Sequence, residues 1–334
     1  HQPPGGDRVR LEERLPLDTP FVIQIFPIYA CNFTCKYCHF SIERSQRCFV
    51  TDRVSMDLGL YQKCINEIQT FPEKVKTLRF VGMGEPLLHP KIVEMVRYAK
   101  EKNVANRIEI LSNGSLLTSA LSDALVDAGL DRLVISLQGI SAEEYWKMSS
   151  VHLDFKAFVD GIRYFFEHRR QTHVYLKIVD IALKDEEERQ RYFGIFGNIC
   201  DTIGIEHAVP IFSDVQYNKE LATHARETQF GTEVIPSRIC PQPFYILQIN
   251  PDGKVVGCHS VAYPEILGDC NLDSVVNIWN GENYNRFRYR MLHGMDTVCD
   301  VCRNCNMMTL RTQPEDAIFD KSDRLKKFYE KNEK

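Results

Sequence analysis

The sequence predicts an α/β fold built around a parallel sheet, and two observations support this prediction. Apolar runs of strand length alternate with segments of helical period over the first two thirds of the 334 residues, which is the pattern of consecutive strand–helix units. Polar and glycine-rich residues gather directly after each apolar run. In parallel α/β folds, that end of the strands is where binding and catalytic sites are built.

Six apolar runs are predicted to form the strands. Each is short, rich in branched or aromatic side chains and followed by a turn, as the strands of a buried sheet are. Because helices separate them, we expect parallel pairing with right-handed crossovers. The runs cover residues 21–28, 77–82, 107–111, 133–139, 174–182 and 205–211.

Five segments between these runs are predicted to be helices. Their apolar residues recur at a spacing of three or four, as Ile65 and Ile68 do in the first segment, so that they lie on one helical face. Thr118 or Ser119 is the expected N-cap of the third helix, and Gly129 marks its end. The segments cover residues 56–71, 90–102, 118–128, 155–168 and 186–200.

The last third of the chain has a different pattern. Residues 213–237 have no clear period and are interpreted as a linker or a substrate-facing loop. Residues 244–258 predict a hairpin, because Asn250 to Gly253 supply a turn between two apolar strands. One helix is expected over 275–291, and the charged residues 320–334 are expected to be a solvated end.

Composition excludes several classes of protein. Hydrophobic residues make up 44% of the chain and charged residues 26%, which is ordinary for a globular protein. The formal net charge of −4 argues against a broad surface for nucleic acid or anionic membrane. No apolar run approaches the ~20 residues that span a bilayer, and no signal peptide opens the chain. We therefore expect neither nucleic acid nor membrane as a partner.

The 12 cysteines are numerous and unevenly distributed. Disulfide frameworks belong mainly to small secreted domains. In a long chain without an export signal, tight Cys-x-x-Cys clusters indicate metal or cluster ligands instead. The expected compartment is the reducing cytoplasm.

The most informative cluster is the segment from Cys31 to Cys38, which follows the first predicted strand. Its three cysteines, Cys31, Cys35 and Cys38, can hold three corners of a cubane iron–sulfur cluster and leave the fourth iron open for chemistry. The alternative is a structural zinc site, which needs a fourth protein ligand. Only His39 and Cys48 lie near enough in the sequence to supply one.

This spacing, with Tyr37 before the last cysteine, resembles that of the radical S-adenosylmethionine (radical SAM) enzymes. Residues Gly82 to Pro86 resemble the family's Gly-Gly-Glu-Pro segment, in which backbone groups and the glutamate meet the amino group of SAM. Gly84 and Glu85 match, whereas Met83 stands where the family has its first glycine. Taken alone, the segment is weak evidence, because a strand-ending glycine turn is the alternative. Its position one strand after the cysteine segment supports the resemblance.

Further positions resemble contacts with SAM in this family. Ser112 and Asn113 end the third predicted strand, and Ser136 and Gln138 end the fourth. For Ser112, Asn113 and Ser136 the alternative is simple turn chemistry. Gln138 stands where many members carry aspartate. Lys177 lies within the fifth strand, and its side chain faces either the SAM carboxylate inside the fold or the solvent outside it.

The C-terminal cysteines resemble the SPASM domain of radical SAM enzymes, or its shortened "twitch" form, which holds auxiliary 4Fe–4S clusters. The second half of the full pattern is missing, so the resemblance implies one auxiliary cluster. Cys240 and Cys258 are its expected ligands, with two of Cys299, Cys302 and Cys305. The spacing leaves the choice among these three open, and a zinc ribbon is the alternative.

The remaining cysteines are ambiguous. Cys270 lies between the two halves of the C-terminal set. It is interpreted as a catalytic hydrogen-atom donor, although a ligand or a buried small hydrophobe would also suit its position. Cys48, Cys64 and Cys200 lie in or beside predicted helices, where packing is the expected role.

The resemblance implies a partial (β/α)6 TIM-like barrel with a small C-terminal α+β cluster-binding domain. It also implies a SAM-derived 5′-deoxyadenosyl radical that abstracts a hydrogen atom, with flavodoxin or ferredoxin as the external reductant. Dehydrogenation of a sugar or aminocyclitol alcohol, with the auxiliary cluster as electron acceptor, is the favoured reaction. The alternatives are a radical epimerase, a peptide-modifying SPASM enzyme and a non-catalytic zinc or iron–sulfur scaffold or redox sensor.

The expected organisation follows from these assignments. Residues 1–20 are too few for the recognition domain that peptide-modifying members often carry. After the last barrel strand, the pocket candidates are His207, Asp214, Tyr217 and Asn218. The predicted parts are an N-terminal extension, the barrel, a linker, the auxiliary domain and a tail, over residues 1–20, 21–212, 213–237, 238–310 and 311–334.

Overall fold

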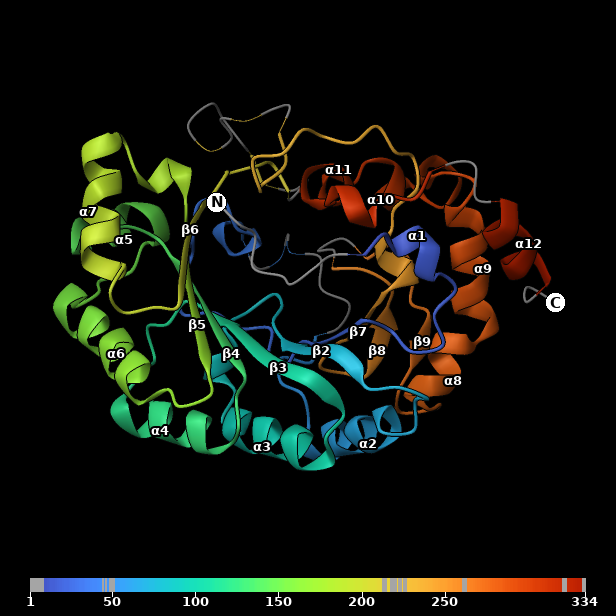
Figure 1. Cartoon of the computed structure of the whole chain (residues 1–334), viewed down its shortest axis with the longest axis horizontal. Helices are drawn as coiled ribbons and strands as arrows, with labels where there is room; N and C mark the ends of the chain where they lie inside the picture. The colour runs from blue at the N-terminus through green and yellow to red at the C-terminus, as the bar shows by residue number, and fades with distance from the viewer. Residues whose placement is uncertain are drawn as a thin grey trace.

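A computed structural model describes the chain over residues 9–43, 45, 47, 52–211, 215–216, 221, 224, 227–259, 263–319 and 323–331. These residues form one curved nine-stranded sheet with the strand order β6-β5-β4-β3-β2-β1-β7-β8-β9 (Figure 1). The strands are β1 Val22–Ile25, β2 Val75–Phe80, β3 Ala105–Ser112, β4 Arg132–Leu137, β5 His173–Val179, β6 Thr202–Glu206, β7 Ile246–Ile249, β8 Lys254–Val256 and β9 Gly268–Asp269.

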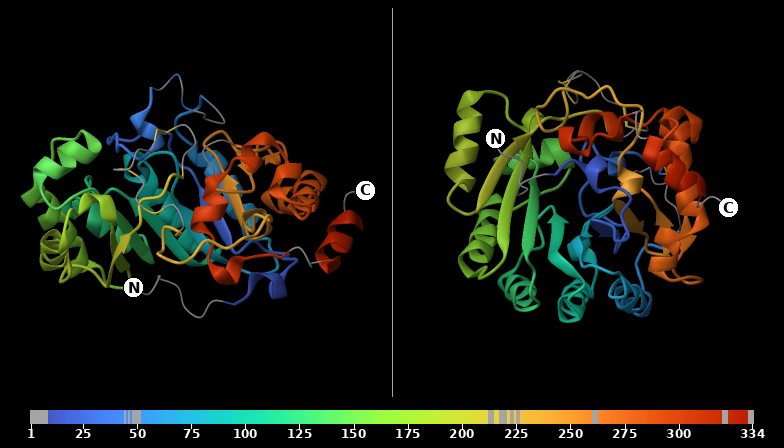
Figure 2. Two further views of the ribbon diagram at one scale, coloured as in Figure 1. Left: turned by 90° about the horizontal axis from the view of Figure 1, so that it is seen from above. Right: turned by 45° about the vertical axis from the view of Figure 1, so that its right-hand side comes forward.

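Most of the helices form a layer around the outside of this sheet, as Figures 1 and 2 show from three directions. The long ones in the first two thirds follow their strands in sequence, as the alternating pattern predicts. The helices are α1 Leu11–Arg14, α2 Leu58–Ile68, α3 Ile92–Lys102, α4 Ser119–Asp127, α5 Ala142–Ser149, α6 Phe155–His168, α7 Glu186–Phe196, α8 Val275–Asn280, α9 Glu282–Met291, α10 Asp300–Arg303, α11 Asn306–Arg311 and α12 Asp323–Lys331.

The parallel α/β class and the open barrel are confirmed. Strands β1 to β6 pair in parallel in chain order, and β6 and β9 are the two edges of the sheet within the described residues. The capping prediction for α4 also holds, because Thr118 Oγ1 accepts from Leu121 N. The sixth strand is shifted from its predicted range of 205–211 and ends at Glu206, so His207 lies just beyond it.

The C-terminal hairpin joins the main sheet. Strands β7 and β8 pair antiparallel, as the turn sequence predicts, and β7 also pairs in parallel with β1, placing Val22 opposite Ile246. The auxiliary cysteines are therefore attached directly to the sheet that carries the N-terminal cysteine segment. The boundaries of the predicted domains stay predictions.

Two predictions about the C-terminal helices are wrong. The single helix expected over 275–291 is divided at Gly281 into α8 and α9. The tail is packed rather than solvated, because Leu325 and Tyr329 lie four residues apart on one face of α12 and are both buried. The Tyr329 ring meets the ring of Phe244 edge-on.

The two faces of the sheet have different side chains. On β3, Ile108 and Ile110 belong to the apolar core, whereas the alternate residues Arg107 and Glu109 line a cavity on the concave side. The fold therefore buries apolar residues under the helices and turns polar residues inward. No helix of the described residues has the length and apolar character needed to cross a membrane.

Candidate active site

Backbone hydrogen bonds hold the cysteine segment after β1 at the carboxyl ends of the strands. Glu85 N donates to Ala30 O at 2.8 Å, which ties the start of the segment to the loop after β2. Thr34 N donates to Ser149 O at 3.0 Å, and Lys36 N donates to Met148 O at 2.9 Å, which ties its middle to the end of α5. These ties fix the segment that carries the three cysteines.

The three thiols lie close enough to affect one another. Burial raises the pKa of Cys31 to about 12. It also raises the pKa of Cys35 well above its usual value, with further contributions from Cys38 and Cys31. Phe33 N donates to Cys31 Sγ at 3.4 Å, as amides do around iron–sulfur clusters. Clustered thiolates in a dry site need a cation, so the donor set fits an iron–sulfur cluster held by three cysteines.

A small apolar cluster encloses this segment on one side. It is separate from the main core and packs against Cys31 and Cys38. Such a shell limits the access of water and lowers the local dielectric constant. Both effects tune the redox potential of a metal cluster. Its buried members are Phe26, Tyr29, Phe40, Val81 and Met83.

The loop from Gly82 to Pro86 lies directly against the cysteine segment. A Cβ at Gly84 would lie 2.2 Å from Ile28 O and 2.8 Å from Ala30 O, so only glycine permits this approach. The Glu85 carboxylate is buried and accepts hydrogen bonds from Ser112 Oγ and Asn113 N, both at 2.7 Å. Glu85 thus joins the loop after β2 to the turn after β3.

The predicted SAM contacts after β3 and β4 gather at the same end of the sheet. Asn113 Nδ2 donates to Asn32 Oδ1 at 2.9 Å, inside the cysteine segment. The Tyr37 hydroxyl donates to Gln138 Oε1, and Gln138 Nε2 donates to Ser136 O at 3.0 Å. The structure therefore brings these residues to the rim of one site, while their contacts with SAM stay predictions.

Lys177 faces the inside of the fold. It lines the cavity and forms an ion pair with Glu206 at 2.7 Å, so the alternative in which it points outward is wrong. The side chains of Lys177 and Glu206 are 15% and 14% exposed, respectively. They come from adjacent strands, β5 and β6, whose register places Lys177 opposite Gly204.

The concave side of the sheet encloses a cavity of about 500 Å³. Its wall contains an unusual charge arrangement, in which Arg79, Arg107 and Arg132 all pair with the single carboxylate of Glu109. The three arginines compete with burial and keep the pKa of Glu109 below its usual value. One carboxylate cannot neutralise three guanidinium groups, so this wall has excess positive charge.

Two arginines of the cavity have unused donor capacity. Arg132 is buried, and its Nε and Nη2 have no hydrogen-bond partner in the described part of the chain. Arg311 of α11 contacts the thioether of Met307 and forms no ion pair with any described residue. Burial lowers the pKa of the cavity residue His259 to about 3, with Arg311 and Arg79 adding to the effect.

The C-terminal cysteines come from three separate segments and meet beside the cavity. Cys240, Cys258, Cys302 and Cys305 line one apolar pocket, and the pKa of Cys302 is raised by burial and by its neighbour Cys299. The pocket is otherwise lined by thioether, aromatic and aliphatic groups, including Phe287, Met291, Met307 and Met308. This donor set fits a second cluster.

Comparisons with known protein families agree with the arrangement of the cysteines. The model of the radical SAM superfamily matches residues 25–190, including the first cysteine segment. The chain belongs to the radical SAM superfamily. A second model, that of the SPASM iron–sulfur cluster-binding domain, matches residues 240–306. This radical SAM enzyme therefore uses 4Fe–4S clusters and S-adenosylmethionine as its cofactors.

Individual relatives are distant. The tungsten-containing aldehyde ferredoxin oxidoreductase cofactor-modifying protein of Pyrococcus furiosus is 24% identical over 311 residues, covering 81% of this chain and 84% of that protein. The GTP 3',8-cyclase of Chlorobaculum tepidum is 37% identical over 123 residues, which are 37% of this chain and 34% of the cyclase. The crystal structure of BtrN with AdoMet and 2-DOIA has a TM-score of 0.56 at 19% identity, covering 90% of this chain and 98% of BtrN.

The structure does not bring Cys270 to the radical SAM site. Its thiol is fully buried and hydrogen-bonds with that of Cys64, which raises its pKa strongly, with burial adding to the effect. Cys64 belongs to α2 in the outer helical layer, and neither thiol lines the cavity. Cys200 is also a packing residue, because its sulfur contacts Phe196 O at 3.3 Å. Cys48, like the pocket candidates Asp214, Tyr217 and Asn218, lies outside the described residues.

Sequence reasoning missed the charged wall of the cavity. The available signal was the presence of Arg79, Arg107, Glu109 and Arg132 inside or beside runs that were predicted to be buried strands. A charge within such a strand needs a partner or a polar cavity. Arginines of three different strands share Glu109. Only the order of the strands in the sheet brings them together.

Proposed function

We propose that this radical SAM enzyme dehydrogenates a small anionic molecule bound in the cavity, and that the auxiliary cluster accepts the electron. The main support for this proposal is that the cavity and the pocket of the auxiliary cysteines share lining residues. Gln242 and Met307 line both the cavity and the pocket of the auxiliary cysteines, and His259, another cavity residue, directly follows Cys258. A substrate radical in the cavity would therefore lie close to an electron acceptor.

Residues at the carboxyl ends of the strands hold and orient the reacting groups. When bound, the first cluster and SAM supply a 5′-deoxyadenosyl radical, which takes a hydrogen atom from carbon. Cys31, Cys35 and Cys38 hold the cluster, while the Glu85 carboxylate keeps the turn at Ser112 and Asn113 against it. Fixed geometry is the main contribution of the protein in such chemistry, since the cofactor performs the difficult step.

Dehydrogenation of an alcohol carbon must also remove a proton and an electron. We propose that Glu206 accepts the proton, because it lines the cavity at the end of β6 and has only Lys177 and the Gln229 amide as its described hydrogen-bonding partners. Glu109 is a less suitable proton acceptor, since its carboxylate is paired with three arginines. Gln242 and Met307 line both the cavity and the pocket of the auxiliary cysteines, so a cluster held there would be the acceptor of the electron, and the alcohol would leave as a ketone.

The charge of the cavity favours a carboxylate- or phosphate-bearing substrate. Arg132 lines the cavity and has donors without a described partner, and guanidinium binds these anions through paired hydrogen bonds. Arg132 begins β4 and Ser136 lies four residues later, about 13 Å away at ~3.3 Å per strand residue. An anionic sugar could span this distance, whereas the ammonium group of an aminocyclitol would face positive charge.

Two other reactions receive less support. An epimerase needs a hydrogen-atom donor near the substrate, and Cys270 is enclosed with Cys64 instead. Peptide modification has no feature of the described cavity that favours it over a small molecule. The name of the Chlorobaculum relative, GTP 3',8-cyclase, agrees with a phosphate-bearing substrate for at least one similar protein.

The experiment is an anaerobic substrate screen with the fully reconstituted enzyme. Sugars that differ only in a phosphate, a carboxylate or an amine are compared by 5′-deoxyadenosine formation and by the loss of two hydrogen atoms from the product. We expect turnover of the anionic series. Turnover confined to amino sugars or peptides would contradict the proposed substrate class, and a product of unchanged mass with an inverted centre would contradict dehydrogenation.

A matched pair of arginine variants tests the anion site. Arg132→Met is expected to raise KM by about 10- to 100-fold, because a hydrogen bond to a charged group contributes about 1.5–3 kcal/mol. SAM cleavage without substrate should be unchanged. Arg286→Met is the control, since Arg286 lies on α9 and pairs with the exposed Glu282. Equal KM values in the two variants would remove Arg132 from substrate binding.

A further inference from the structure

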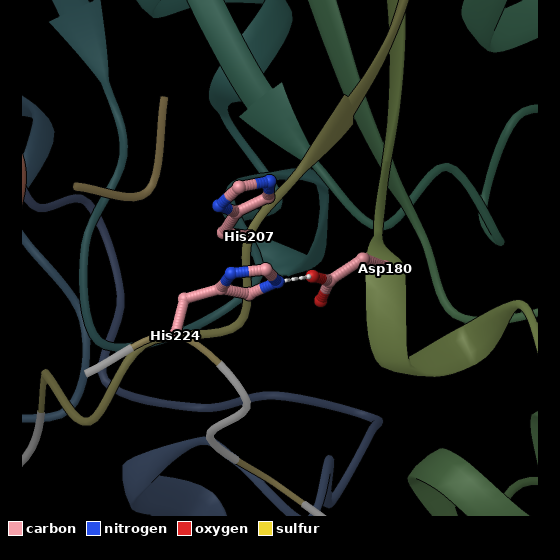
Figure 3. Close-up of side chains that lie close together, drawn as sticks. All are labelled: Asp180, His207 and His224. Atoms are coloured by element: carbon pink, nitrogen blue, oxygen red, sulfur yellow. Dashed lines mark ion pairs between the residues drawn. The ribbon is translucent and has the colours of Figure 1, made fainter. Parts of the chain in front are cut away.

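Asp180, His207 and His224 form a second group of ligand-type side chains, which contains no cysteine (Figure 3). Each offers one ligand atom, and these atoms all lie within 4.8 Å of one another. Asp180 begins the turn after β5 and His207 directly follows β6. His224 comes from the connection that follows, so three separate parts of the chain converge.

The contacts within this group are close. His224 Nε2 lies 2.8 Å from Asp180 Oδ2, and its ring stacks on that of His207 with centroids 3.7 Å apart. Figure 3 shows the two imidazoles lying face to face, with Asp180 at the edge of the His224 ring. Glu227 Oε2 lies 3.1 Å from Nδ1 of both histidines.

One nitrogen of this group is left unsatisfied. His207 Nδ1 is buried and lies 3.1 Å from Glu227 Oε2, yet it forms no hydrogen bond within the described residues. In neutral His224 with its Nδ1–H directed at Glu227, Nε2 presents a lone pair to the Asp180 carboxylate, and either a proton or a metal ion between the two atoms removes this repulsion. Within the described residues, no lysine or arginine pairs with Asp180 or Glu227 to supply the charge instead.

The carboxylate of Asp180 is already oriented for a ligand. Its Oδ1 accepts from Ile181 N at 2.8 Å and from Ala208 N at 2.9 Å, which leaves Oδ2 facing the histidines. Ligating carboxylates are held in this way by further hydrogen bonds, and ligating histidines donate their other ring nitrogen to a carboxylate. Asp180 and Glu227 meet these two requirements.

We propose that Asp180, His207 and His224 bind one divalent first-row transition metal ion, with Glu227 as the outer carboxylate that orients both imidazoles. Two imidazoles and one carboxylate suit Zn²⁺, Fe²⁺ or Mn²⁺ and leave coordination positions open. The ion ties His224 to the ends of β5 and β6. Its ligand His207 directly follows Glu206, a residue of the cavity wall, in the chain. This proposal does not depend on the substrate or reaction proposed above.

Manganese binding to the fully reconstituted enzyme tests the site. The cysteines then hold oxidised clusters, which are silent in electron paramagnetic resonance, so the loss of the free Mn²⁺ signal reports binding elsewhere. We expect one Mn²⁺ per chain, displaced by Zn²⁺. Asp180→Asn and His224→Gln should abolish binding, and Glu227→Gln should weaken it by about 10- to 100-fold, as losses of outer partners do.

The control is His168→Gln, since His168 is exposed on α6 and its Nδ1 contacts the backbone of its own helix. Iron content and SAM cleavage show that each variant is folded. In the wild type and the His168→Gln control, but not in Asp180→Asn or His224→Gln, Mn²⁺ or Zn²⁺ should raise the unfolding temperature. Absence of stoichiometric binding to the wild type, or equal binding to wild type and Asp180→Asn, would overturn the proposal and leave a protonated ion-pair network.

Discussion

The two cysteine regions use the same ligand chemistry in different surroundings. The first region presents three thiols from one short segment after β1, at a rim that also carries Glu85 and Asn113. The second gathers five thiols from separate segments around a pocket lined by methionine and aromatic side chains. The first region is local in sequence and has a polar rim. The second is brought together only by the fold, and its surroundings are apolar.

This difference suits two different roles. A cluster with three protein ligands keeps one iron open for a small molecule, and polar turns beside it can hold that molecule. A cluster with four protein ligands inside an apolar pocket is closed to ligands and suited to passing electrons. The number of ligands and the surroundings thus indicate the same division of labour.

The largest expected effect comes from removing the first set. In a Cys31/Cys35/Cys38→Ala variant, iron should fall from about eight to about four atoms per chain, because one 4Fe–4S cluster is lost. SAM cleavage should disappear. Anaerobic iron analysis and a 5′-deoxyadenosine assay measure both quantities. If cleavage survived, or if zinc occupied the sites after strictly anaerobic preparation, the radical SAM assignment of this segment would fail.

Removing one ligand from the second set should separate the two functions. Cys258→Ala is expected to lose about four irons and to stop product formation, while reductive SAM cleavage continues. Single alanine variants of Cys299, Cys302 and Cys305 sharpen the comparison, since one of them should keep all iron if only two are ligands. Cys200→Ala, a packing site, is the control. Normal product formation without the auxiliary iron would refute its role as acceptor.

Close packing at the rim predicts a smaller effect. Gly84→Ala would place a Cβ 2.2 Å from the carbonyl oxygen of Ile28, and we expect a loss of about 2 kcal/mol in stability together with impaired SAM cleavage. The matched variant is Gly194→Ala in α7, where no atom lies within 4 Å of the new Cβ. It should stabilise the helix by about 0.5–1 kcal/mol. Thermal unfolding measures both changes, and similar effects would contradict the packing argument.

The smallest expected effect is on Cys270. Because its thiol is enclosed with that of Cys64, Cys270→Ala should cost about 1 kcal/mol of stability and leave the turnover number unchanged. Steady-state turnover and thermal unfolding provide the measurements. A variant with normal stability and lost turnover would restore the interpretation of Cys270 as a hydrogen-atom donor.

Much of the fold was predictable because its signals are local. Strand and helix alternation depends on residues a few positions apart, and so does the cap at Thr118. The break at Gly281 and the packing of α12 were missed because contacts with distant residues decide them. Tyr329, for example, packs on Phe244, and the sequence contains no sign of that pairing.

The sequence by itself determined the class of the protein, since the spacing of Cys31, Cys35 and Cys38 places three ligands on one short segment whatever the rest of the chain does. Only the tertiary structure decided the positions that depend on the order and register of the sheet. It placed Glu109 among arginines of three strands and Cys270 against Cys64. The physical reason is that such contacts join residues far apart in the chain, and a shift of one residue in any strand would turn them to the opposite face.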